Sequence, residues 1–441
     1  MTTNPPAAGV QIPSLPEVYR SIEIPKSGWR RFLAFLGPGY LVSVGYMDPG
    51  NWATDIAGGS KFGYTLLSVI LISNLMAILL QSLCVRLGVA TGRDLAQACR
   101  DYYSKPVSIV LWILCEIAII ACDLAELLGS ALAINLLFGI PMAVGVCLTT
   151  LDVLLLLWLQ NKGFRYTEAI VVTLVTTIAI CFGAQVWMSQ PEWAGVAGGL
   201  VPTPQVLANP EMLYIAMGIL GATVMPHNLY LHSSIVQTRA WHASDQDKHE
   251  AIKYATIDSS VALSLAFFVN AAILVVAAAT FHRAGQFEVA DIRDAYQLLS
   301  PLLGVSMAST LFALALLASG TASTLTATLA GQIVMEGFIH IRLPAWLRRL
   351  VTRLLALVPA LVTIVYFGEN STGSLLVLSQ VVLSLQLSFA VIPLVIFTSD
   401  KSRMGPFVNP RWLTAVSWVV GIVIGGLNAW LLVQTFGTVF S

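Results

Sequence analysis

Long apolar stretches, separated by short polar connectors, cover most of the chain. A transmembrane helix needs about 20 predominantly apolar residues. On that criterion the pattern predicts eleven spans, over residues 32–58, 64–91, 107–137, 142–160, 166–188, 213–240, 254–281, 306–338, 346–367, 374–397 and 412–439. Helices satisfy their own backbone hydrogen bonds in lipid, so the predicted fold class is an all-α membrane protein.

Composition supports this interpretation and excludes several others. Of the 441 residues, 57% are hydrophobic and 10% are charged, and the mean hydropathy is +0.79. Soluble proteins carry about 25% charged residues, so this chain lacks the polar surface of a soluble enzyme or a disordered protein. Lys and Arg number 23 and Asp and Glu 23, which leaves no basic excess for nucleic acid. The six cysteines form no C-x-x-C pair, and we interpret them as small buried apolar residues.

The distribution of basic residues predicts the orientation. Twenty of the 23 Lys and Arg fall in or beside the N-terminal segment and the alternate connectors on its side, whereas Lys61, Arg283 and Arg293 lie on the other side. Cytoplasmic connectors carry the excess of positive charge, so we expect a cytoplasmic N-terminus and an outside C-terminus. The proline-rich residues 1–31 are expected to form a flexible cytoplasmic tail.

Two of the predicted spans contain helix-breaking sequences in their middle. The first holds residues 45–51, Gly-Tyr-Met-Asp-Pro-Gly-Asn, and the sixth holds residues 221–228, Gly-Ala-Thr-Val-Met-Pro-His-Asn. A proline kink would explain a single break, but polar breaks in lipid survive only where they line a cavity or face protein. Corresponding broken spans in two halves are typical of inverted-repeat transporters. We therefore predict one repeat over 32–188, a second over 213–397, and an additional span over 412–439.

The two breaks carry side chains that suit a cation. Asp48 offers a carboxylate, Asn51 an amide oxygen and Met225 a thioether, and we expect unwound carbonyls from Gly45 and Ala222. Oxygen ligands alone would suit Mg²⁺, Ca²⁺ or Na⁺. A soft thioether favours Mn²⁺, Fe²⁺ and softer divalent ions such as Cd²⁺, although apolar packing is the commoner role of a membrane methionine. An intramembrane acid such as Asp48 is usually functional.

Further polar residues lie within the predicted spans. Gln380, in the tenth span, either completes a metal shell or makes an interhelical hydrogen bond, which is the commoner role. Acidic residues occur in or near the spans, whereas no Lys or Arg lies deep in one. This balance favours a cation over an anion as the species that the protein binds. These acids are Asp48, Asp55, Glu116, Asp123, Glu126, Asp152 and Glu336.

The third span carries a possible proton route. Glu116, Asp123 and Glu126 are spaced by seven and three residues, which places them on one helical stripe. His227 and His232 follow the second break, and histidine titrates near physiological pH. Buried carboxylates and imidazoles near a cation site can pass protons.

Two alternatives to the proton route are open to a structural test. Asp123 and Glu126 can instead neutralise Arg348 and Arg349 at the inner end of the ninth span, and the two interpretations are compatible. The histidines can instead be ligands of a zinc enzyme, but their spacing of five does not match H-E-x-x-H and no glutamate follows His227. We therefore do not expect an enzyme.

These motifs resemble those of the Nramp family of divalent-metal transporters, in its bacterial form. The resemblance is carried by residues 48–51, Asp-Pro-Gly-Asn, and 222–227, Ala-Thr-Val-Met-Pro-His, with support from 122–129 and 330–338. It extends from about residue 32 to the end. It implies a fold similar to that of the sodium-coupled amino-acid symporters (LeuT-like), and proton-coupled uptake of Mn²⁺ and Fe²⁺ by alternating access.

The resemblance also implies roles for particular residues. The implied metal ligands are Asp48, Asn51, Met225 and the Ala222 carbonyl, with the Gly45 carbonyl and Gln380 as state-dependent candidates. The implied proton-linked acid is Asp123, and its associated network comprises Glu126, His227, Arg349, Glu116, Arg348 and His232. Cys122 departs from the family pattern, in which we expect threonine, and leaves the polar detail beside Asp123 open.

The predicted function is import of Mn²⁺ and Fe²⁺, with Cd²⁺ and Co²⁺ as further substrates, by proton symport across the cell membrane. The expected partners are divalent metal ions, protons and the lipid bilayer, with no cofactor, no nucleic acid and no obligate protein partner. Two alternatives are a sodium-coupled symporter of a small solute on the same fold and a metal-binding sensor without transport. Sodium-free uptake excludes the first, and the absence of an evident output domain disfavours the second.

Overall fold

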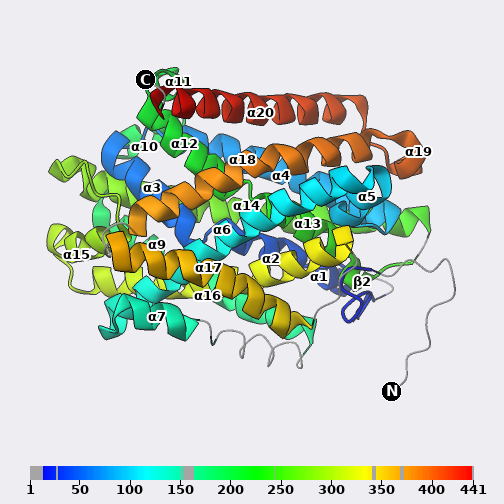
Figure 1. Cartoon of the computed structure of the whole chain (residues 1–441), viewed down its shortest axis with the longest axis horizontal. Coiled ribbons are helices and arrows are strands. Elements are labelled where there is room, and N and C mark those ends of the chain that lie inside the picture. The colour runs from blue at the N-terminus through cyan, green and yellow to red at the C-terminus, as the bar shows by residue number, and fades with distance from the viewer. Residues whose placement is uncertain are drawn as a thin grey trace.

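The computed structural model describes residues 13–25, 28–149, 151, 163–242, 244–339, 344–367 and 372–439. It is built almost wholly from helices that run side by side (Figure 1). The longest are α4 (Leu67–Thr91), α6 (Lys105–Phe138), α9 (Phe164–Ser189), α14 (Asp245–Thr280), α16 (Met307–Ile339), α17 (Ala345–Phe367), α18 (Thr372–Ser399) and α20 (Arg411–Val439). The predicted all-α membrane fold is thus confirmed.

Eight helical segments in the described part of the chain are long and apolar enough to cross a membrane. They are Leu67–Thr91, Lys105–Phe138, Phe164–Ser189, Pro210–Thr238, Asp245–Ala284, Met307–Ile339, Thr372–Ser399 and Arg411–Val433. Each of the other three predicted spans also contains helix. The first is divided into short helices, the fourth begins as α7 (Met142–Thr149) and continues outside the described residues, and the ninth is α17. The number eleven stays a prediction.

Both predicted breaks are present. In the first span, three residues separate α2 (Pro38–Gly45) from α3 (Pro49–Phe62). In the sixth, α12 (Pro210–Thr223) is separated from α13 (Pro226–Ile235) by Val224 and Met225. A proline opens the second helix of each pair, where its missing N–H breaks no helical bond.

The first span has a second joint that we did not predict. Helix α1 (Trp29–Phe35) is followed by Leu36, whose backbone is extended, and Gly37 has a φ of 131° before α2 begins. That φ favours glycine. A Cβ on Gly37 would also lie 2.4 Å from the carboxyl carbon of Glu168. Glycine therefore permits both the turn and the close approach of α9.

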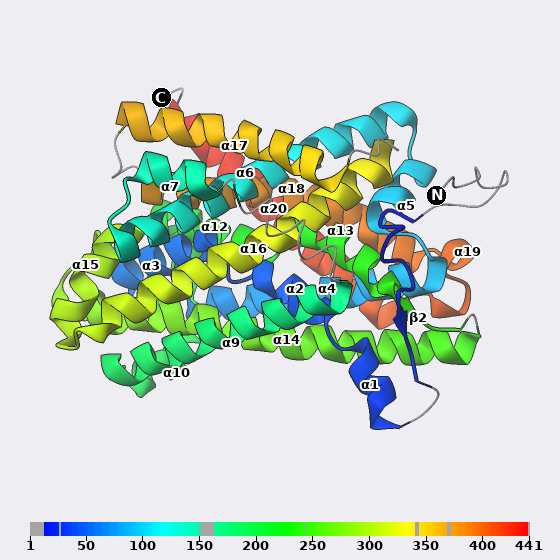
Figure 2. The ribbon, with the colours of Figure 1, turned by 90° about the horizontal axis from the view of Figure 1, so that it is seen from below.

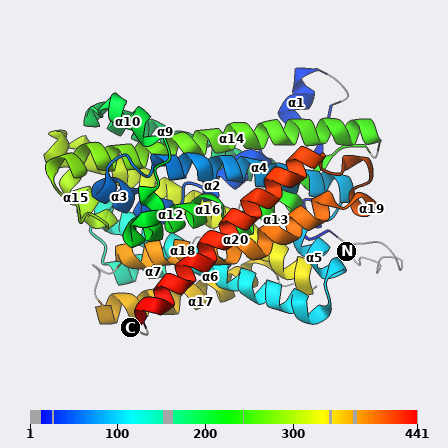
Figure 3. The same ribbon diagram turned by 90° about the horizontal axis from the view of Figure 1, so that it is seen from above.

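The helices on the outside differ in surface from those at the centre. In its most apolar window, Pro210–Thr238 is 94% buried, whereas α9 and α20 are each 33% buried. Helix α20 lies across the outside of α18 (Figure 3). Large apolar side chains such as Ile180, Trp187 and Val433 are exposed on these outer helices. Such a surface fits contact with lipid, and it leaves the two broken spans in the interior.

Short helices gather at the two ends of the bundle. Helices α10 (Trp193–Gly199), α11 (Gln205–Ala208) and α15 (Ile292–Leu303) lie at one end, and α1, α5 (Leu95–Tyr102) and α19 (Lys401–Met404) lie at the other (Figures 1 and 2). Alternate connectors therefore share an end, as a chain that crosses a membrane repeatedly requires. The remaining short elements are η1 (Val236–Thr238), η2 (His282–Ala284) and η4 (Gly405–Phe407).

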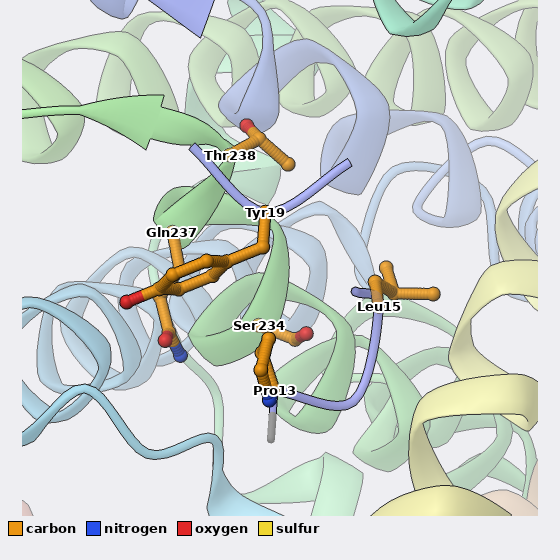
Figure 4. Close-up of a pocket in the computed structure, with 6 residues that line it drawn as sticks. All are labelled: Pro13, Leu15, Tyr19, Ser234, Gln237 and Thr238. Carbon is orange, nitrogen blue, oxygen red and sulfur yellow. The ribbon is translucent and has the colours of Figure 1, made fainter. Parts of the chain in front are cut away.

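The described part of the predicted tail is packed rather than loose. Strand β1 (Ile22–Glu23) pairs in parallel with β2 (Arg239–Ala240), and Leu15 is buried. The Ser14 hydroxyl donates to Asp94 at 2.5 Å. Figure 4 shows Pro13, Leu15 and Tyr19 beside Ser234, Gln237 and Thr238, at the end of α13 and in η1. We call residues 13–25 the strap. The proline content of this segment favoured a flexible tail. The contacts that hold it are made to residues far along the chain, so no local sequence pattern indicates them.

Candidate functional site

Asp48 lies at the first break, where it caps the helix that follows. One carboxylate oxygen, Oδ1, accepts from the Asn51 backbone N–H at 2.8 Å, an ordinary N-cap bond. The other, Oδ2, has no hydrogen-bond partner among the described residues, and the side chain is fully buried. The side-chain oxygen of Asn51, Oδ1, is buried and unpartnered in the same way. The cap thus holds one oxygen and leaves the other for a ligand.

The second break packs against the first. Met225 caps α13 and is fully buried. A Cβ on Gly45 would lie 3.2 Å from the Met225 sulfur, so this sulfur reaches the end of α2. Asn228 donates to the same sulfur at 3.7 Å and to the Val42 carbonyl at 3.5 Å. The structure therefore brings Gly45 and Met225 together, although they are far apart in sequence.

Both breaks free a carbonyl in the same way. In a helix, the carbonyl of residue i accepts from the N–H of residue i+4. The residue four positions after Gly45 is Pro49, and the residue four positions after Ala222 is Pro226. Proline has no N–H to donate, so neither the Gly45 nor the Ala222 carbonyl has this bond. These are the two carbonyls predicted as metal ligands.

Gln380 of α18 lies against the first turn of α3. A Cβ on Gly50 would be 1.7 Å from the Gln380 amide nitrogen, so glycine is required for this approach. The nitrogen donates to the Ser379 hydroxyl at 3.1 Å, while the amide oxygen is buried without a partner among the described residues. Gln380 thus joins the predicted ligands at the break.

Two further polar side chains near the breaks were not predicted. The Thr223 hydroxyl and the Asn228 side-chain oxygen are buried and unpartnered within the described chain. Both residues lie inside an apolar span and close in sequence to a predicted ligand, and this position could have identified them. No group of three or more His, Cys, Asp or Glu that could hold a metal occurs in the described residues. A metal at the breaks would therefore be bound by one carboxylate, a thioether and neutral oxygens.

The acidic pair of the third span meets a different arginine from the predicted ones. Arg353 of α17 lies 3.6 Å from the Glu126 carboxylate and 4.0 Å from the Asp123 carboxylate, and all three residues are buried. The side chains of Arg348 and Arg349 lie outside the described part. Arg353 also donates to the Thr324 hydroxyl at 2.8 Å. Sequence reasoning missed Arg353 because we grouped it with the charges of the cytoplasmic connector.

Cys122 links the acidic pair to the second break. Its sulfur lies 3.7 Å from Glu126 Oε1 and 3.8 Å from His227 Nε2. His227 is buried, and its Nδ1 has no partner among the described residues. Cys122, where we expected threonine, thus lies between two members of the predicted proton network.

His232 and Glu116 lie apart from this contact. His232 Nδ1 is 2.9 Å from the Gln81 oxygen, and the Gln81 nitrogen donates to the Tyr46 hydroxyl at 2.8 Å. His232 is therefore connected to the first break. Glu116, half-buried, accepts from Trp112 at 3.0 Å in the previous turn of α6.

These features define a multi-pass α-helical membrane protein with a buried candidate cation site between two broken helices. The chain matches the family described as natural resistance-associated macrophage protein-like, Nramp, over residues 39–434. It therefore belongs to the Nramp family, and the resemblance seen in the motifs is confirmed.

Relatives and solved structures agree with this assignment. The chain is 71% identical over 425 residues to the divalent metal cation transporter MntH of Nostoc sp., with 96% of each chain covered. It is similar to the crystal structure of the Eremococcus coleocola manganese transporter, at a TM-score of 0.88 and 41% identity over 96% of this chain and 92% of that one. Mhp1, a nucleobase-cation-symport-1 family transporter, shares the fold at a TM-score of 0.61 and 15% identity, over 91% of this chain and 93% of that chain. The LeuT-like fold is thus confirmed.

Proposed function

We propose that this protein imports divalent transition metals, Mn²⁺ and Fe²⁺ before Cd²⁺ and Co²⁺, together with protons, across the cell membrane. The observation that carries the proposal is the packing of the Met225 sulfur against Gly45, at the end of α2. Asp48, which is three residues further along this break, is buried with one carboxylate oxygen unpartnered within the described chain. The names of the Nostoc and Eremococcus relatives support a divalent metal, and manganese in particular, as the substrate.

Met225 is the proposed source of selectivity. A carboxylate with neutral oxygens would bind Ca²⁺ and Mg²⁺ readily. Thioether sulfur contributes little to those hard ions and more to softer transition metals. The sulfur therefore disfavours Ca²⁺ at a site that is otherwise made of oxygen. Asn51 and Gln380 would supply further oxygens.

Alternating access is the proposed transport cycle. The breaks divide each of two central spans into halves that can move separately, while the site between them stays in place. In this cycle the cytoplasmic end of the bundle is the one that contains the N-terminal strap, α5 and α19, as the positive-inside distribution predicts.

The proposed proton route starts near Asp48 and passes His227 and Cys122 to Glu126 and Asp123. Arg353 holds the acidic pair, so a proton that binds there exchanges an ion pair for a neutral acid. Uptake of Mn²⁺ with an internal pH dye tests this route. In Asp123→Asn we expect uptake to continue while internal acidification is lost, and unchanged acidification would contradict the role of Asp123.

The main test is Mn²⁺ uptake into sealed liposomes containing the purified protein, with Ca²⁺ as competitor and no sodium present. We expect wild-type uptake to resist excess Ca²⁺, and uptake by Met225→Ala to become Ca²⁺-sensitive. Met217→Ala is the matched control, because Met217 is equally buried in α12 but lies two turns before the break. Binding of Mn²⁺ without uptake would favour the sensor, and uptake that requires sodium would favour the solute-symporter alternative.

A further inference from the structure

Three oxygen-bearing side chains lie along one stripe of α3. Asp48 caps the helix, Asn51 is in its first turn and Asp55 is one turn further. At 3.6 residues per turn, Asp55 is rotated by about 40° from Asn51 and about 20° from Asp48, and its Cα lies about 6 Å beyond that of Asn51 along the helix. Asp55 therefore follows the predicted metal ligands on the same face.

Asp55 has no structural role that its surroundings explain. Its side chain is 1% exposed, and its Oδ2 atom has no hydrogen-bond partner among the described residues. It makes no ion pair within them either. It sits in the middle of α3, so it caps no helix end. A buried carboxylate without donors is costly, and either a proton or a nearby positive ion must neutralise it.

No protein cation fills that need within the described chain. The basic residue of the same helix is Lys61, which pairs with Glu211 and also lies 3.5 Å from Glu288. Two stretches that pack on α3 are apolar where they meet it, since Gly58 meets Ile215 of α12 and Gly59 meets the backbone of α14 at Leu274 and Ala278. A proton or a mobile cation is therefore left to neutralise Asp55, and the unpartnered Asn51 oxygen on the same face favours the cation.

We propose that Asp55 and Asn51 form a second cation position on α3, between the outer end of this helix and the site at Asp48. Its ligand is a divalent metal ion that keeps part of its water shell, because the stripe supplies a carboxylate and an amide oxygen at this level. The stripe leads from Asp48 toward the end of α3 where Glu211 and Glu288 are exposed, and this end is the predicted outer one.

The proposal rests on the proposed function and adds a division of labour to it. The Asp55 position offers only oxygen, so it accepts Ca²⁺ as readily as Mn²⁺. Selection then takes place at Met225, which lies at the next position inward. An ion at Asp55 would raise the local metal concentration for Asp48, and Asn51, which lies between them, belongs to both positions.

Binding of Mn²⁺ alone to the purified full-length protein is the first test. We compare wild type, Asp48→Asn, Asp55→Asn and the double variant by electron paramagnetic resonance of free Mn²⁺. Asp48→Asn should keep one weak Mn²⁺ site that Ca²⁺ displaces, and the double variant should lose it. Absence of residual binding in Asp48→Asn, or its survival in the double variant, would overturn the proposal.

Uptake into liposomes is the second test. In Asp55→Asn the external Mn²⁺ concentration for half-maximal uptake should rise about tenfold, as expected for loss of one charged ligand contact, with little change in the maximal rate. Glu288→Gln, which removes an exposed carboxylate, is the matched control. Asp55→Glu keeps the charge and should retain the second site, so it separates a folding defect from loss of binding. An Asp55→Asn protein with wild-type uptake would refute the proposal.

The two levels of inference fail in different ways. If wild type binds Mn²⁺ but does not carry it, the proposed transport is wrong, and the binding comparison still tests Asp55. If wild type transports Mn²⁺ and the Asp55 variants match it in binding and uptake, only the proposal of a second cation position is wrong. Asp55 is then neutralised by a proton.

Discussion

A buried ion pair holds the joint between α1 and α2, and it provides a quantitative test of the structure. Arg239, 1% exposed, donates to Glu168 at 2.6 Å and to the carbonyls of Ala34 and Leu36 at 3.1 and 2.5 Å. Arg165 donates to the other Glu168 oxygen at 3.0 Å and to the same two carbonyls at 2.9 Å each. Two guanidinium groups thus share one carboxylate and two carbonyls.

This arrangement predicts unequal effects for the two halves of the pair. Glu168→Gln removes the anion that faces Arg239, and leaves a buried cation with neutral partners. Loss of one member of a buried pair costs about 3–5 kcal/mol. Arg239→Met removes the buried cation instead, but Arg165 still serves the carboxylate and both carbonyls. We therefore expect Arg239→Met to destabilise by about 1–2 kcal/mol, a cost nearer to that of a lost charged hydrogen bond.

Equilibrium unfolding of the purified protein in mixed micelles, followed by tryptophan fluorescence, measures these differences. The double variant Glu168→Gln/Arg239→Met should be more stable than Glu168→Gln alone, because it no longer contains the unpaired cation. Arg165→Met is the matched control, since that side chain is nearly half exposed and its loss should have a small effect. A larger destabilisation by Arg239→Met than by Glu168→Gln would refute the reasoning, as would strict additivity in the double variant.

Three further changes have defined outcomes. Gly221→Ala would place a Cβ 2.1 Å from the backbone oxygen of residue 380, so we expect a loss of about 3 kcal/mol in the same unfolding assay, whereas Gly426→Ala, which meets nothing within 4 Å, should have no such effect. Pro226→Ala supplies an N–H that allows the break to close into helix by pairing with the Ala222 carbonyl, so Mn²⁺ affinity should fall while the fold is retained; unchanged affinity would contradict this competition. Burial raises the pKa of Asp94 from 3.8 to about 6, despite hydrogen bonds from Ser14 and the Gln97 backbone that lower it. A raised acid pKa means that the folded state binds the proton more tightly, so its contribution to stability is present at low pH and lost as pH rises through about 6. When the pH is lowered from 7.5 to 4.5, the free energy of unfolding of wild type should therefore rise by about 2 kcal/mol relative to that of Asp94→Asn. Parallel pH profiles of the two proteins would contradict this assignment.

The parts of the site that depend on local chemistry were predictable from the sequence. Proline and glycine inside an apolar span act on the backbone within one turn, so the breaks before Pro49 and Pro226 could be located without tertiary information. The candidate ligand types at Asp48 and Met225 followed from the same short stretches. The packing of α2 against α13 required the structure, and the Gly45–Met225 contact shows it.

The parts that depend on distant contacts were not predictable. The strap is held by Asp94 and by β2, which lie far along the chain from it. Arg353 was assigned to a connector because its phase on α17 relative to Asp123 depends on how that helix packs on α6. A helical period fixes which residues share a face, but not which neighbouring helix the face meets.

The positions of Pro49 and Pro226 explain why the site is made largely of backbone and neutral groups. Each proline stands at the start of a helix and offers no N–H to the carbonyl four residues earlier, so that carbonyl stays an acceptor in the protein interior without an added charge. The adjacent glycines then allow close approach: Gly45 admits the Asn228 amide and the Met225 sulfur, and Gly50 admits Gln380. A second carboxylate among these groups would bind a divalent ion more tightly, but it would also strengthen binding of Ca²⁺ and slow release. One acid, one sulfur and unpaired carbonyls fit the proposed role, in which the site binds a divalent transition metal and then releases it.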